Sequence, residues 1–357
     1  MTSGRVGAQI VLPLPPSVGP APWTRRPRAW FIGGGLALLA AAAAVSAATV
    51  DSDGGFNLVS LTRSVASVIT GLRWQYTAIV IGLAAAHYGA TAIAARAGAG
   101  VPFPLREIFL VQLAAAAANR LTPAGLGGSA VTARYFTRRG LAAPAAIGAV
   151  GALAVLGAVA DLLVLCGLVF LGSWLGLHGA AGELTALTAH VVHLLGPVRS
   201  PWLWLVLSAL AAGLGGVWAA RRRPARRGDW GRVWQPIRRL AHQPGALATL
   251  VLASGATTLV LAFAFVATTA MVPGPQPTAG LGALLIAFML GAAAGSAVPV
   301  PAGLGSTEAA LIAVLISVHI PAQHAVEEVL IFRLLTFWAP AAVGILATRA
   351  LYRSRAL

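Results

Sequence analysis

One five-residue segment, Pro-Ala-Gly-Leu-Gly, occurs twice, at residues 123–127 and 301–305. Proline lacks a backbone donor and glycine disfavours a helix, so each copy should end one apolar helix before another begins. The first N–H groups of a helix attract phosphate. We therefore expect both breaks to bind an anionic headgroup, through Pro123, Gly125, Gly127, Ser129, Pro301, Gly303, Gly305, Ser306 and Thr307. Two alternatives stay open: the hydroxyls only cap a helix, or the glycines only let helices pack closely.

Basic side chains next to the first copy could take part in the same binding. Asn119 and Arg120 lie shortly before it, separated from Pro123 by Leu121 and Thr122. An arginine in the membrane interior costs several kcal/mol unless it is paired or hydrated. Arg120 could pair with Asp161, or it could bind a lipid phosphate bidentately. Arg134 and Arg138, one helical turn apart, are expected to be ordinary cytoplasmic charges, with headgroup capture as the second interpretation.

Three charged residues lie within apolar segments and could form a gate. Glu308 falls in the first turn after the second copy, where the helix dipole stabilises a carboxylate. Arg333 lies in the following span, about one turn from its predicted outer end. We expect a Glu308–Arg333 ion pair, which is either structural or a gate that opens when Glu308 is protonated. Asp161 is a functional candidate because intramembrane acids are costly.

Other patterns give weaker signals. Asp51 and Asp53 lie in the first outer loop, where membrane glycosyltransferases that use lipid-phosphate sugars place an acidic pair. The chain could thus be such an enzyme, or a non-transporting partner of one. His190 and His193 have poor metal spacing, and the sequence has no nucleotide-binding or hydrolase motif. We therefore predict no metal site, no cofactor and no catalytic residues.

Composition places these residues in a membrane. The 357-residue chain is 58% hydrophobic and 10% charged, with a net charge of +16 carried by arginine alone. Apolar runs of 18 or more residues recur, which is typical of a multi-pass membrane protein. The arginines gather in short loops, as the positive-inside rule requires, so nucleic-acid binding is not expected. Arginine without lysine in an alanine-rich chain suggests a GC-rich actinobacterium, with the protein in its cell membrane.

The predicted fold is an all-α polytopic membrane protein with about six full spans and two re-entrant helical hairpins. Spans are expected near residues 30–50, 74–95, 144–171, 201–220, 246–271 and 329–350. The hairpins are expected near 107–139 and 280–318. Three spans separate them, so they enter from opposite faces as an inverted repeat and can meet near the midplane.

The rest of the predicted organisation follows from charge. Residues 1–28 are expected to be a disordered cytoplasmic tail, and residues 29–352 the transmembrane domain. Residues 221–243 are its basic cytoplasmic loop. Glu327 and Glu328 are placed in an acidic outer loop before the last span. This arrangement puts both termini in the cytoplasm.

Two longer segments resemble one known family. The segments are residues 119–140, NRLTPAGLGGSAVTARYFTRRG, and residues 299–308, PVPAGLGSTE. They look like the two signatures of the flippase-like lysylphosphatidylglycerol synthase transmembrane family. The second motif lies within a longer repeat signature at 297–320, which corresponds to the first at 119–140. Arg333, in IFRLLTFWAP, matches an arginine of the family's last span. The resemblance implies movement of lipids or lipid-linked headgroups between leaflets, so membrane lipids, possibly lipid-linked sugars, are the expected partners.

The resemblance also has limits. In members with a separate soluble aminoacyltransferase domain, the membrane domain flips aminoacylated phosphatidylglycerol. No long soluble segment follows residue 350 here, so lysyl transfer is not expected. The family often has an acidic residue where this chain has Ser129-Ala130, and a charged pair where it has Gly157-Ala158. These departures leave the lipid class open.

Overall fold

A computed structural model describes residues 70–120, 122, 126–174, 229–277, 279–297 and 305–357. The chain divides into two units, residues 1–44 and 45–357, and every described residue belongs to the second. Several predictions lie outside the described residues. They are the tail, the spans at 30–50 and 201–220, Asp51, Asp53, His190 and His193, and the motif residues Pro123, Gly125, Pro301 and Gly303.

Four of the described helices are long and apolar enough to cross a membrane. They are α3 (Gln75–Ala99), α6 (Ala143–Trp174), α10 (Pro244–Met271) and the continuous run Ala322–Arg353. Three of them match predicted spans within a few residues, because uninterrupted apolar sequence sets their length. The predicted all-helical membrane architecture is thus confirmed for the described residues. The total of six spans and the inverted repeat stay predictions.

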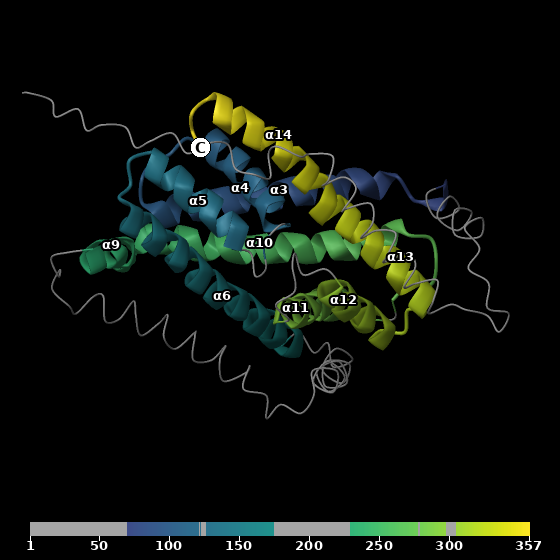
Figure 1. The fold of residues 1–357 in the computed structure, drawn as a ribbon. Coiled ribbons are helices and arrows are strands. Elements are labelled where there is room, and N and C mark those ends of the chain that lie inside the picture. Colours follow the sequence, from purple (N-terminus) through teal and green to yellow (C-terminus); the bar gives the residue numbers. More distant parts are fainter. Residues whose placement is uncertain (1–69, 121, 123–125, 175–228, 278, 298–304) are drawn as a thin grey trace, which may run out of the picture. The chain divides into compact units, whose positions relative to one another are not determined.

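Shorter helices form where the two hairpins were predicted. The first pair is α4 (Leu105–Asn119) and α5 (Leu126–Arg138), and the second is α11 (Leu281–Ala297) and α12 (Ser306–Ser317). At about 1.5 Å per residue, each helix is shorter than the ~30 Å hydrocarbon core. The two helices of each pair pack against each other. In the sequence, one copy of the five-residue segment lies between the two helices of each pair, and the helices themselves are labelled in Figure 1.

The last predicted span differs from expectation in its start and in its interior. It consists of α13 (Ala322–Arg333), the π-helical turn η2 (Leu334–Trp338) and α14 (Ala339–Arg353). The predicted outer loop with Glu327 and Glu328 is therefore wrong: both residues lie in α13, which Pro321 begins. Arg333 then lies three turns from the start of the helix rather than one. Pro340 cannot donate to the preceding turn, which accounts for the π geometry there.

Two apolar cores flank the middle of the described unit. One is formed by the second hairpin, α10 and α13, with Phe265, Phe288 and Phe332 in mutual ring contact. The other is formed by the first hairpin, α3 and α6, around the fully buried Tyr135 and Phe136. Each hairpin is thus anchored by its own core, and both contribute to the cavity described below.

The predicted basic loop contains a helix that the sequence analysis missed. This helix, α9 (Asp229–His242), packs against α6 and buries Leu240. A side chain at Gly148 of α6 would collide with the backbone carbonyl of Val233, so the glycine permits the close approach. The sequence analysis assigned this segment to a loop because of its many arginines, and so it did not consider that the segment could form a helix with one apolar face.

Candidate functional site

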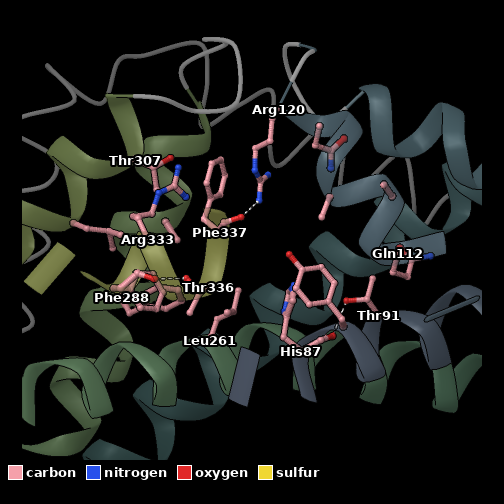
Figure 2. A pocket seen from close by; sticks show the side chains of 17 residues that line it. His87, Thr91, Gln112, Arg120, Leu261, Phe288, Thr307, Arg333, Thr336 and Phe337 are labelled. Atoms are coloured by element: carbon pink, nitrogen blue, oxygen red, sulfur yellow. Dashed lines mark hydrogen bonds between the residues drawn. The ribbon is translucent and has the colours of Figure 1, made fainter. Parts of the chain in front are cut away.

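A cavity of about 300 Å³ lies between the two hairpins and the spans that support them. Its walls come from α3, α4, α10, α11, α12, α13 and η2. Figure 2 shows that lining side chains come from both sides of the cavity, with Arg120 and Arg333 on either side of Phe337 and His87 below them in this view. The polar and charged lining residues are His87, Tyr88, Thr91, Gln112, Asn119, Arg120, Thr307, Arg333 and Thr336. Because Arg120 follows α4 and Thr307 opens α12, both hairpins contribute to one polar space.

Two arginines stack on one aromatic ring at this cavity. The guanidinium carbon of Arg120 lies 3.1 Å from the ring centroid of Phe337, and that of Arg333 lies 3.6 Å from it. Figure 2 shows the ring between the two guanidinium groups. Arg120 Nη2 also donates to the backbone carbonyl of Phe337 at 2.8 Å. Cation–π contact and this hydrogen bond stabilise two positive charges close together, one on the half-buried Arg120 and one on the buried Arg333.

Neither guanidinium has all its donors satisfied. Arg120 Nε and Arg333 Nη2 are buried without a hydrogen-bond partner among the described residues. Arg333 has a carboxylate partner, Glu308, whereas the described residues contain no ion pair of Arg120. Arginine stays charged in proteins. The site therefore carries positive charge and free donors that an anion can satisfy.

Glu308 joins the second hairpin to the last span. Its Oε1 accepts from Arg333 Nε at 2.6 Å, and its Oε2 accepts from the Gly305 N–H at 2.8 Å. The two charged side chains are only 14% and 10% exposed, so solvent screens the pair weakly. Gly305 has φ of +85°, a conformation that favours glycine. The Glu308–Arg333 contact expected from the sequence is present, and its gating role stays a prediction.

The helix starts differ from what the sequence suggested. Gly127 N–H donates to Thr122 Oγ1 at 2.6 Å, and Gly128 N–H donates to Asn119 Oδ1 at 2.5 Å. The N–H groups of Gly127 and Gly305, which were expected to bind phosphate, are thus used within the hairpins, as is that of the neighbouring Gly128. Short polar side chains satisfy orphan donors at a helix start better than water can inside apolar packing. Positive charge in the cavity comes instead from side chains.

Four other predicted residues that the structure describes do not line the cavity. Ser129 is exposed on α5, and Ser306 donates to the Gly295 carbonyl at 2.8 Å. Arg134 lies over the ring of Tyr352 in α14, 5.9 Å from its centroid. Asp161 accepts a hydrogen bond from Thr258 of α10 rather than meeting Arg120. Of the predicted site, Asn119, Arg120, Thr307 and Arg333 line the cavity, with Glu308 bonded to Arg333.

Several lining residues were missed. His87 and Tyr88 come from the middle of α3, and the Nδ1 atom of His87 donates to the Thr257 carbonyl at 3.1 Å. Gln112 belongs to α4. Polar side chains inside apolar runs are a signal that could have found all three. Phe337 carries no such signal, because an aromatic residue in an apolar span is ordinary.

Comparison with known families places this geometry in context. The family model described as "Lysylphosphatidylglycerol synthase TM region" matches residues 30–344. The chain belongs to this family. The resemblance read from the two signatures is therefore confirmed, and the matched range contains both hairpins, Arg120 and Arg333. A search of curated proteins finds no match. As a member of the lysylphosphatidylglycerol synthase TM-region family, the chain is a multi-pass membrane protein.

Proposed function

We propose that this protein is a flippase for lipids with an anionic phosphate headgroup, either phospholipids or lipid-linked (polyprenyl-phosphate) sugars. The observation that carries the proposal is a pair of guanidinium groups in one polar cavity, each with a buried donor atom that has no partner among the described residues. The headgroup would bind there while the tails stay in the bilayer. Membership of a family of lipid-associated membrane domains supports the same interpretation.

The energetics favour a phosphate over a neutral ligand. Burying a charge without a partner is costly, and a charge-assisted hydrogen bond recovers part of that cost. A phosphate oxygen can accept from Arg120 Nε, and a second from Arg333 Nη2. Thr307, at the start of α12, adds a hydroxyl to the same wall. A bound phosphate would therefore neutralise the charge that Glu308 leaves uncompensated.

The size of the cavity limits what enters it. A volume of about 300 Å³ is at the lower end of the range for small-molecule sites. We expect it to hold a phosphate with a small polar substituent while the two acyl chains stay in the bilayer. A larger sugar headgroup would require the hairpins to separate. Substrate size is thus a second property that experiment can examine.

The test is leaflet exchange in reconstituted liposomes. Fluorescent phospholipids and fluorescent polyprenyl-phosphate sugars are compared for the wild type, Arg120→Ala and Arg349→Ala. Arg349 is an exposed arginine of α14 and serves as the matched control. We expect Arg120→Ala to slow exchange at least tenfold and Arg349→Ala to leave it unchanged. Exchange by the wild type no faster than in protein-free liposomes, for both lipid classes, would refute the flippase function.

The alternative functions are examined by measuring sugar transfer alongside leaflet exchange. Asp51 and Asp53, which a glycosyltransferase would need, lie outside the described residues. Loss of sugar transfer in Asp51→Asn/Asp53→Asn, with Arg120→Ala unaffected, would favour the enzyme. A non-transporting partner would show neither activity alone.

We also propose the cell membrane as the location, with the arginine-rich C-terminal end of α14 in the cytoplasm.

A further inference from the structure

Glu328 is a buried carboxyl group that lies outside the cavity. It belongs to α13, inside the membrane-crossing run Ala322–Arg353, and is only 2% exposed. Its Oε2 has no hydrogen-bond partner among the described residues. An acid inside a membrane helix is costly unless it is paired, hydrated or protonated. The way in which Glu328 avoids this cost is therefore informative.

The described surroundings supply no cation to pair with Glu328. Its neighbour Glu327 is also acidic, and Arg333, further along α13, is engaged by Glu308 of α12. The other packed elements, α10 and η2, contain no titratable residue. Near the start of α3, Arg73 donates to the Ala270 carbonyl. Tyr76 packs in one apolar cluster with Ile331 of α13, and the other titratable groups beside α13 in the sequence are His319, before the helix, and His324, in its first turn. Within the packing that the described residues form, protonation is therefore the remaining way to remove the charge.

A second side chain with a buried, unpartnered atom, His324, lies one turn away on the same face of α13. His324 precedes Glu328 by four residues, a spacing that places side chains next to each other on a helix. Its Nδ1 is buried without a hydrogen-bond partner among the described residues. The histidine is nearer the start of α13, where Pro321 and Ala322 are exposed. An imidazole between a buried acid and exposed residues can pass a proton between water and the acid.

We propose that Glu328 is a proton-binding site, served by His324, that couples lipid movement to proton movement. The proposal rests on the flippase function proposed above. Protonation converts the carboxylate to a neutral acid with a proton from water on the side of Pro321, and deprotonation returns it. Loss of the proton leaves a charge without a partner among the described residues, and a shift of α13 that lets water or a cation reach the carboxylate would lower this cost. Arg333 lies five residues further along α13, so this movement reaches the cavity.

The proton site is examined first, by a measurement that does not depend on transport. Infrared difference spectra of the reconstituted protein are recorded over a pH titration. A protonated carboxyl in an apolar site gives a C=O band that a carboxylate lacks. We expect such a band in the wild type and in Glu327→Gln, and its loss in Glu328→Gln. A band unchanged in Glu328→Gln, or no band in any sample, overturns the proposal.

Coupling is examined in liposomes with an imposed pH gradient. We expect the gradient to change wild-type exchange severalfold, and reversal of the gradient to reverse the effect. Glu328→Gln should exchange at one rate under both gradients, whereas Glu327→Gln should behave as the wild type. Wild-type exchange that ignores the gradient overturns coupling but leaves the flippase function intact. Absence of wild-type exchange in every condition refutes the flippase function and coupling with it, while the infrared titration still decides whether Glu328 binds a proton.

Discussion

Arg120 and Phe337 contact each other twice, although they are 217 residues apart in sequence. The guanidinium stacks 3.1 Å from the ring centroid, and Nη2 donates to the backbone carbonyl of the same residue. The contact joins the end of α4, beside the first sequence break, to the π-helical turn η2. Such turns are frequent at functional sites because they alter the regular backbone bonding. The first hairpin and the last span are thereby held together at the cavity.

The planar shape of Arg120 should matter as much as its charge. We expect Arg120→Lys to slow lipid exchange by about tenfold or more, because an ammonium cannot both stack on Phe337 and present a free Nε–H to a phosphate. Tenfold corresponds to about 1.4 kcal/mol, the scale of one charge-assisted hydrogen bond. Exchange is measured with the fluorescent lipids, and Arg349→Lys is the matched control. Equal rates for Arg120→Lys and the wild type would show that charge alone is sufficient.

Phe337 should contribute to stability through its ring rather than through its apolar volume. We expect Phe337→Leu to lower the free energy of unfolding by about 1–3 kcal/mol, because the guanidinium groups of Arg120 and Arg333 both lose a cation–π partner. The measurement is the thermal unfolding midpoint of the detergent-solubilised protein. Phe337→Trp keeps an aromatic face and should preserve more of the midpoint than the leucine variant. The opposite order of the two variants would contradict the stacking argument.

Much of the fold was predictable because apolar run length and arginine placement are local properties of a membrane protein. The positions of α3, α6 and α10 followed from run length, and both hairpins followed from the duplicated break. The last span was placed about seven residues late, because two glutamates made its first turns look like a loop. Glu328 is buried by neighbouring helices, and a linear sequence does not show which helices cover which residue.

The candidate site was predictable only in part, for a related reason. Arg120, Glu308 and Arg333 stood out because charge is rare in apolar runs. The use of Asn119 and Thr122 to satisfy the start of α5 depends on how closely the hairpin folds back on itself. The role of Phe337 depends on two arginines from distant segments meeting at one ring. Both are tertiary features, and neither leaves a sequence pattern.

The Glu308–Arg333 pair should be strongly coupled. We expect Glu308→Gln alone to cost about 3 kcal/mol or more, because it leaves Arg333 buried without a counter-charge and weakens the bond to Gly305. Arg333→Gln should cost a similar amount. The double variant should cost clearly less than the two single costs added, which a double-mutant cycle of unfolding free energies measures. Additive costs would indicate that the two charges do not interact in the membrane.

The first turn of α5 should be intolerant of any side chain at Gly128. A Cβ added there would lie 2.6 Å from Asn119 Oδ1, the atom that accepts the Gly128 N–H. We expect Gly128→Ala to displace Asn119 and to lower the free energy of unfolding by about 1–3 kcal/mol, through strain and a lost hydrogen bond.

The matched control for Gly128→Ala is Gly151→Ala, at an exposed position of α6 where an added Cβ meets nothing within 4 Å. Alanine is the better helix former, so this variant should be neutral or more stable by up to about 1 kcal/mol. Because Asn119 also lines the cavity, Gly128→Ala should slow lipid exchange as well, whereas Gly151→Ala should not. Thermal unfolding and leaflet exchange of the two variants measure both effects. Equal behaviour of the two glycines would show that Asn119 is not held by the start of α5.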